Sequence, residues 1–197
     1  ELVVRLHRHC SERGIPYKIH FVQDPVAWTE CPASLAILSR QRDRWQRGLF
    51  QSLTRHRVML LNSTYGKAGL LAFPYFFFLE MLGPVIEAMG YVSFGATVVA
   101  GRADWPYVLA FLGVAVVLGV ALSVAAVALE ELSFRRYPRF ADLGRLFGLA
   151  VLENFGYRQM SAWWRLKGTW SAIRGVEGWG RMQRKGFTLL DAPEGDT

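Results

Sequence analysis

Trp28-Thr29-Glu30-Cys31-Pro32, then Gln41-Arg42-Asp43-Arg44-Trp45, then Gly48: this stretch decides how the rest of the chain is interpreted. Pro32 predicts the first turn of a helix, because its missing N–H would have no partner there, and no helix breaker follows before Gly48. On that helix Gln41, Arg44 and Trp45 stand at i, i+3 and i+4 and share one face. An amide and a guanidinium suit a sugar hydroxyl and a phosphate, and an indole suits the apolar face of a sugar.

The pattern at residues 41–45 resembles the Gln-x-x-Arg-Trp (QxxRW) motif of membrane-embedded family 2 glycosyltransferases, the group of cellulose, hyaluronan and poly-N-acetylglucosamine synthases. The Thr29-Glu30-x-Pro32 lead-in and the hydrophobic hairpin downstream resemble the same group. The alternative interpretation is structural: Arg42, Arg44 and Arg47 would form a solvated helix face, and Trp45 would be a core residue.

The resemblance implies a hexosyltransferase that moves a sugar, with inversion, from a UDP-sugar to a growing polysaccharide or a lipid-linked acceptor. It implies that Gln41, Arg44 and Trp45 bind substrate at the acceptor end of the sugar site. Arg44 would neutralise the departing diphosphate, and Trp45 would stack on the acceptor sugar. Secondary candidates are Arg42, Thr29 and Glu30.

The resemblance also implies a divalent metal, Mg²⁺ or Mn²⁺, whose ligands we do not expect in this chain. The family holds it through an Asp-x-Asp motif, and no two of the six aspartates have that spacing. The family's catalytic base belongs to a Thr-Glu-Asp type motif, which we expect just upstream of Glu1. Glu30 is a poorer base than a capping or supporting group, because Cys31 stands where a carboxylate would be needed. We therefore expect a C-terminal fragment that is inactive alone, with no catalytic residue of its own.

The expected fold is mainly α: the end of an α/β nucleotide-sugar-binding (GT-A-like) domain, followed by interfacial and transmembrane helices. Residues 1–48 would be the α/β remnant, with a helix over 1–13 that stops at Gly14. Strands are predicted at 18–22, from alternating hydrophobicity, and at 26–28.

The distribution of charge indicates a membrane hairpin. The net charge is +7, with eleven Lys and Arg in residues 1–67, one in 68–129 and eleven in 130–197. Two basic flanks around an uncharged middle follow the positive-inside rule for a hairpin with both ends in the cytoplasm. We therefore expect a multi-pass protein of a bacterial-type inner (plasma) membrane, with its catalytic side cytoplasmic and anionic lipids as partners. Nucleic acid is not an expected partner.

The hairpin is predicted at 67–132, after a basic amphipathic interfacial helix and a break at 49–66. Its first segment, Ala68 to Gly101, is longer than one crossing needs, so we expect it either to be kinked near Gly83-Pro84 or to start in the interface. Its second, Trp105 to Leu129, is 25 residues without a charge, enough at about 1.5 Å per residue to cross a bilayer core.

Two carboxylates interrupt the first segment. Glu80 and Glu87 are two helical turns apart and point the same way, and charges at this depth face protein or a wet cavity. They would either line a path for a glycan or lipid acceptor or pair with Arg158, Asn154 or Arg136. We favour the pairing.

Residues 133–187 are expected to form cytosolic or interfacial helices that end in a basic, aromatic tail, and 188–197 a disordered end. The sequence leaves open whether 140–158 lie in the interface, re-enter the membrane or pack on the hairpin.

Another class of function stays open. The chain could be a non-enzymatic membrane scaffold or transporter subunit, with Glu80, Glu87, Glu153 and Arg158 along a path, and an enzyme of this type could itself have an accessory membrane subunit. The sequence does not name the sugar or separate processive from single transfer.

Overall fold

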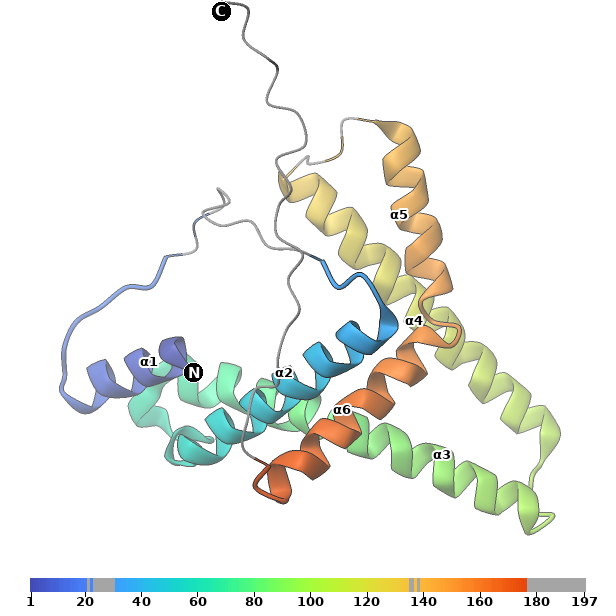
Figure 1. Cartoon of the computed structure of the whole chain (residues 1–197), viewed down its shortest axis with the longest axis horizontal. Coiled ribbons are helices and arrows are strands. Elements are labelled where there is room, and N and C mark those ends of the chain that lie inside the picture. The colour runs from blue at the N-terminus through green and yellow to red at the C-terminus, as the bar shows by residue number, and fades with distance from the viewer. Residues whose placement is uncertain (21, 23–30, 135–136, 138, 177–197) are drawn as a thin grey trace, which may run out of the picture. The chain divides into compact units, whose positions relative to one another are not determined.

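The computed structural model describes residues 1–20, 22, 31–134, 137 and 139–176 (Figure 1). Helices make up nearly all of the regular structure there, and no strand occurs in these ranges. The chain divides into two compact units. Unit 1 comprises Glu1–Phe77 with the chain from Gly168 onward, and unit 2 comprises Phe78–Lys167. The prediction of a mainly α protein is confirmed.

The α/β part of the prediction is not confirmed. Helix α1, Leu2–Glu12, ends before Gly14 as predicted, and Gly14 takes a left-handed φ of +62°. Residues 18–20 and 22 are irregular rather than a strand, and the second predicted strand, 26–28, lies outside the described residues. Among the residues that the structure describes, the first alternating segment has no neighbouring strand to satisfy its backbone groups, which is what a strand requires.

Helix α2, Leu35–Arg55, differs from its prediction at both ends. It begins after Pro32, because Ser34 is its N-cap and accepts a hydrogen bond from the Ile37 N–H at 3.4 Å. A serine at the N-cap satisfies one of the first N–H groups of the helix, which have no partner within it. Gly48 does not end the helix, because a glycine inside a helix costs only about 1 kcal/mol.

The segment predicted as an interfacial helix, residues 49–61, contributes to the core of unit 1. That segment is the end of α2 followed by the short 3-10 turn η1, Arg57–Met59. Its apolar side faces protein, since Leu53 and Met59 are buried, as are Tyr65 of the 3-10 turn η2, Ser63–Tyr65, and Phe73. The segment therefore packs in part inside the unit, while Val58 and Leu61 are exposed, and its place at the membrane interface stays a prediction.

Two helical stretches are long and apolar enough to cross a membrane, Ala68–Val99 and Trp105–Phe134. The second is helix α4, and only 6% of its most apolar window is buried in the protein. A core helix of a soluble protein would be mostly covered, so this exposed apolar surface favours a membrane environment. The finding supports membrane association by length and composition.

The first of these stretches changes its helical form along its length. Two π-helical segments, η3 (Ala68–Ala72) and η4 (Tyr75–Met81), flank Pro74 and precede helix α3, Gly83–Val99. In η3 the Phe73 N–H bonds to the Ala68 carbonyl, five residues back. The Gly69 carbonyl, which Phe73 would take in an α-helix, instead accepts from the Leu61 N–H at 3.1 Å. The predicted interruption near Gly83-Pro84 is confirmed by a bend at Leu82.

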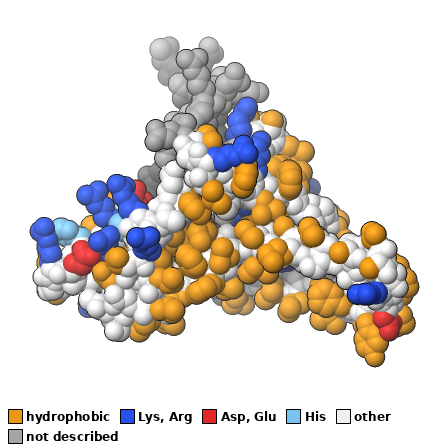
Figure 2. Space-filling view, turned by 90° about the horizontal axis from the view of Figure 1, so that it is seen from below, with side chains coloured by type: hydrophobic (Ala, Val, Ile, Leu, Met, Phe, Trp, Pro, Cys, Tyr) orange, Lys and Arg blue, Asp and Glu red, His pale blue; other side chains and the backbone are white. Residues whose placement is uncertain are grey.

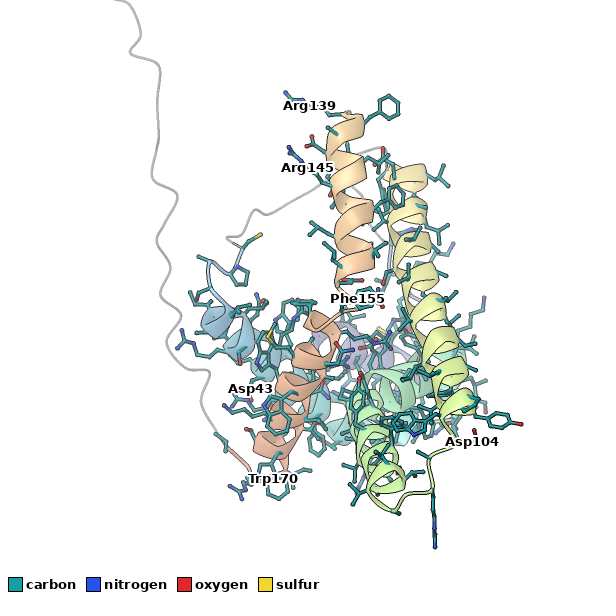
Figure 3. The ribbon with its side chains drawn as sticks, turned by 90° about the vertical axis from the view of Figure 1, so that its right-hand side faces the viewer. Asp43, Asp104, Arg139, Arg145, Phe155 and Trp170 are labelled. Atoms are coloured by element: carbon teal, nitrogen blue, oxygen red, sulfur yellow. The ribbon has the colours of Figure 1, made fainter. Side chains whose placement is uncertain are left out.

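Helices α5, Phe140–Leu152, and α6, Tyr157–Ile173, complete the described chain. Helix α5 lies alongside α4 (Figures 1 and 3), so of the open alternatives for residues 140–158 the structure favours packing on the second span. Just beyond its end the Asn154 amide donates to the Ser123 hydroxyl at 3.4 Å and to the Ala150 carbonyl at 2.9 Å. Gly119 makes room for it, because a Cβ there would lie 2.7 Å from Asn154 Oδ1.

Candidate functional site

The predicted substrate-binding residues lie together on α2 in unit 1. Gln41 and Arg44 are half-buried, and Trp45 is 58% exposed. The alternative interpretation of Trp45 as a core residue is therefore wrong. An exposed indole beside an amide and a guanidinium is the surface that the sequence predicts.

Arg42 orders the exposed indole. Its guanidinium carbon lies 4.9 Å from the centre of the Trp45 ring, a cation–π contact. Arg42 thus leaves one face of the ring less accessible. In this arrangement Arg42, which has intermediate exposure, packs on the ring.

A buried polar contact anchors the same turn of α2. Gln46, 2% exposed, donates from Nε2 to the Thr169 hydroxyl at 3.1 Å. Gly168, next to Thr169, allows close approach, since a Cβ there would lie 2.7 Å from the Asp43 carbonyl oxygen and 2.9 Å from the Gln46 Cβ. Figure 3 shows Asp43 on α2 beside the part of α6 that carries Trp170. The anchoring keeps the Trp45 side of the helix turned outward.

Arg47 belongs to this anchor and not to a solvated face. Its Nε lies 3.0 Å from Asp43 Oδ2, and its Nη1 donates to the Val176 carbonyl at 3.2 Å. Both side chains of this pair are mostly covered. The structural alternative that grouped Arg47 with freely solvated arginines is therefore wrong for this residue.

Thr29 and Glu30 lie outside the described residues, so the lead-in segment is not placed. Over the placed parts of the chain, no three His, Cys, Asp or Glu side chains gather as a metal site. These residues therefore do not fit the divalent metal that the resemblance implies, and we assign them no role in holding it.

Unit 2 contains a second polar feature, a cavity of about 540 Å³ next to α3 and α4. Four ionisable side chains and several hydroxyl and amide groups line it: Glu87, Glu153, Arg158 and Arg165, with Ser123, Asn154, Tyr157 and Ser161. Ionisable groups beside helices that can span a membrane are costly and mark functional or tightly paired positions.

The pairing predicted for the two carboxylates involves different partners. Glu80 Oε2 lies 3.0 Å from Arg165 Nη2, and Glu87 accepts from the Tyr91 hydroxyl at 2.7 Å. Arg165 also donates to the Glu80 backbone carbonyl. In an α-helix that carbonyl would bond to the N–H of residue 84, and Pro84 has none. Arg165 therefore satisfies an acceptor that the proline leaves unpaired.

Three residues that make the contacts described above, Gln46, Thr169 and Arg165, were not identified from the sequence. Each acts through a partner more than eighty residues away, and no local pattern signals such a pair. Gly168 was the available signal, because a glycine inside a helix requires a reason such as close approach of another backbone.

No known protein family matches the chain, and neither a curated protein nor a solved structure does.

Proposed function

We propose that the chain is the C-terminal part of an inverting membrane glycosyltransferase that transfers a sugar from a UDP-sugar to a growing polysaccharide or lipid-linked acceptor. One observation carries the proposal: Trp45 is exposed on α2, on the same side as Gln41 and Arg44, while Gln46 fixes the helix from behind. A ring held outward beside a guanidinium suits stacking on a sugar next to a diphosphate. The two apolar helices support a membrane location for the acceptor.

In this proposal Arg44 stabilises charge and Trp45 positions the acceptor. The guanidinium offsets the negative charge that develops on the leaving diphosphate, which is a transition-state effect. The indole holds the acceptor sugar before and during transfer, so its main contribution is to binding. The base and the metal ligands are assigned to none of the described residues.

The test measures sugar transfer from radiolabelled UDP-sugars in membranes that contain the full-length gene product. Arg44→Ala should lower kcat by about a hundredfold, the size of effect seen when one charge-stabilising donor is removed. Trp45→Ala should mainly raise the KM for acceptor, by about tenfold. Arg40→Ala is the matched control, because Arg40 is an exposed cation on the same helix, and it should leave transfer unchanged. Transfer at the wild-type rate by Arg44→Ala would overturn the proposal.

The rival function, a membrane scaffold or transporter subunit, is favoured by the polar cavity in unit 2. It is distinguished in the same membranes by a second variant, Arg158→Gln, because Arg158 lines that cavity. A transporter subunit would lose transport with Arg158→Gln, and its membranes would show no UDP-sugar consumption that depends on Arg44. The enzyme would show that dependence on Arg44.

A further inference from the structure

Unit 1 contains a polar cavity of about 280 Å³ that the proposed transfer reaction does not use. It is lined at helical spacing by Glu1, the N-cap of α1, and by Arg5, Arg8, His9 and Glu12 of that helix; Arg55 at the end of α2 and its C-cap His56 complete the lining. In Figure 2 the cationic and histidine side chains gather over α1, at the left of the view. The cavity therefore concentrates donors from two elements.

The carboxylates in this cavity are already engaged. Glu12 pairs with Arg8 at 2.7 Å and accepts from the Tyr65 hydroxyl at 3.1 Å, which lowers its pKa, chiefly through the hydrogen bond from Arg8. Glu1 accepts from Arg55 at 3.1 Å. Arg5 and His9 have no ion pair or side-chain hydrogen bond in the described parts of the chain. The lining therefore has an excess of positive charge and of free donors.

His56 adds a buried imidazole whose ring nitrogens make no hydrogen bond. Its side chain is 4% exposed in the protein, and neither ring nitrogen makes a hydrogen bond to any described residue. Glu1 Oε1 is 3.8 Å from Nε2, within ion-pair range of a protonated ring but beyond hydrogen-bond distance. A neutral imidazole carries one N–H donor, and burying it unpaired is unfavourable. An acceptor bound in the cavity would remove that cost.

We propose that this cavity binds a phosphate group, through Arg5, His9 and His56. A phosphate has several acceptor oxygens that point in different directions, so it can accept from both α1 and the end of α2 at once. A guanidinium matches two of those oxygens, and charge-assisted bonds of this kind are the strong ones. A carboxylate, with two oxygens in one plane, would leave part of this donor set unused.

The phosphate could belong to a soluble compound or to a membrane lipid. The lipid source has a structural argument, because the opposite side of α1 borders an apolar cavity of about 530 Å³. Val3 and Val4 line it together with Phe73 and Phe76 from the first membrane-span candidate, and Glu1 borders both cavities. An acyl chain has the chemistry to fill the apolar cavity while its phosphate occupies the polar one.

The test is calorimetric titration of the whole chain in a non-ionic detergent with inorganic phosphate and, separately, with dioctanoyl phosphatidic acid. Dioctanoylglycerol, which lacks the phosphate, is the ligand control. Arg5→Gln should weaken binding of the phosphate probes about tenfold. Arg57→Gln, which removes an exposed cation outside the cavity, should leave it unchanged.

His56→Leu separates binding from folding. Replacing a buried unpaired ring by an apolar side chain should keep or raise the unfolding temperature, while the phosphate probes bind about tenfold more weakly. Tighter binding of phosphatidic acid than of inorganic phosphate would assign a lipid source, and equal binding a soluble one. Either result supports the site if it depends on Arg5. Binding that is absent, or equal in the wild type and Arg5→Gln, would overturn it.

Discussion

Replacing Gly168 with alanine tests whether α2 is anchored by close packing against the end of α6. The added Cβ would lie 2.7 Å from the Asp43 carbonyl oxygen and 2.9 Å from the Gln46 Cβ. Favourable carbon contacts begin at about 3.5 Å, so the two segments must separate by several tenths of an ångström. The atom that must move at Asp43 is backbone, which cannot swing aside as a side-chain tip can.

The expected cost follows from two opposing effects. Overpacking costs about 1–3 kcal/mol, and separation of the segments also weakens the buried bond from Gln46 to Thr169. Alanine gains about 1 kcal/mol over glycine in a helix interior. The control is Gly48→Ala on α2, because a Cβ at Gly48 meets nothing within 4 Å. The Gly48→Ala variant should therefore show only the gain in helix stability.

The assay is thermal unfolding in detergent, followed by tryptophan fluorescence. The two variants should differ by about 2 kcal/mol, which for a chain of this size corresponds to about 4–8 °C in Tm, with Gly168→Ala the lower. Equal changes in Tm for the two variants would refute the close packing of these segments.

Two further predictions concern ionisable groups. Burial, and after it the charge of Arg8, lowers the pKa of His56 below its ordinary value of 6.5. The unfolded chain therefore binds a proton that the folded chain excludes, so stability is complete above pH 6.5 and falls as pH decreases below it. The fall in Tm between pH 7 and 5.5 should be smaller in His56→Leu, and an identical fall would contradict the assignment. In unit 2, Glu80→Gln should lower Tm by about 2–4 °C, because it removes a partly exposed charged partner of Arg165 worth about 1 kcal/mol. Glu153→Gln, an exposed carboxylate on the rim of the cavity, should change Tm by less than about 1 °C, and equal shifts would exclude a stabilising role for the Glu80 pair.

The sequence predicted the features that depend on local chemistry. The stop of α1 at Gly14 follows from the left-handed backbone that glycine adopts, and α4 follows from a long uncharged run. The shared face of Gln41, Arg44 and Trp45 follows from helix geometry alone. Its exposure is a separate fact, because the same pattern was compatible with a buried tryptophan.

Predictions from the sequence were wrong where contacts between distant segments decide the local structure or the ion pair. Alternation at residues 18–22 predicted a strand, but pairing depends on a neighbour that the pattern does not contain. The helix through Gly48 continues because packing around Leu53 outweighs a small local preference. Arg165, and not the predicted Arg158, meets Glu80, because the choice between two arginines two turns apart depends on how α6 is placed within unit 2.

Pro84 and Arg165 have an evolutionary consequence. The ring at 84 removes the donor that would serve the Glu80 carbonyl, and the guanidinium at 165 replaces it. Arg165 is needed at this carbonyl because residue 84 is a proline, and Pro84 is tolerated there because Arg165 supplies a donor. In descendants of this chain, replacing Pro84 by a residue with an N–H should therefore relax one of the two constraints on position 165 and leave the other, the ion pair with the Glu80 carboxylate.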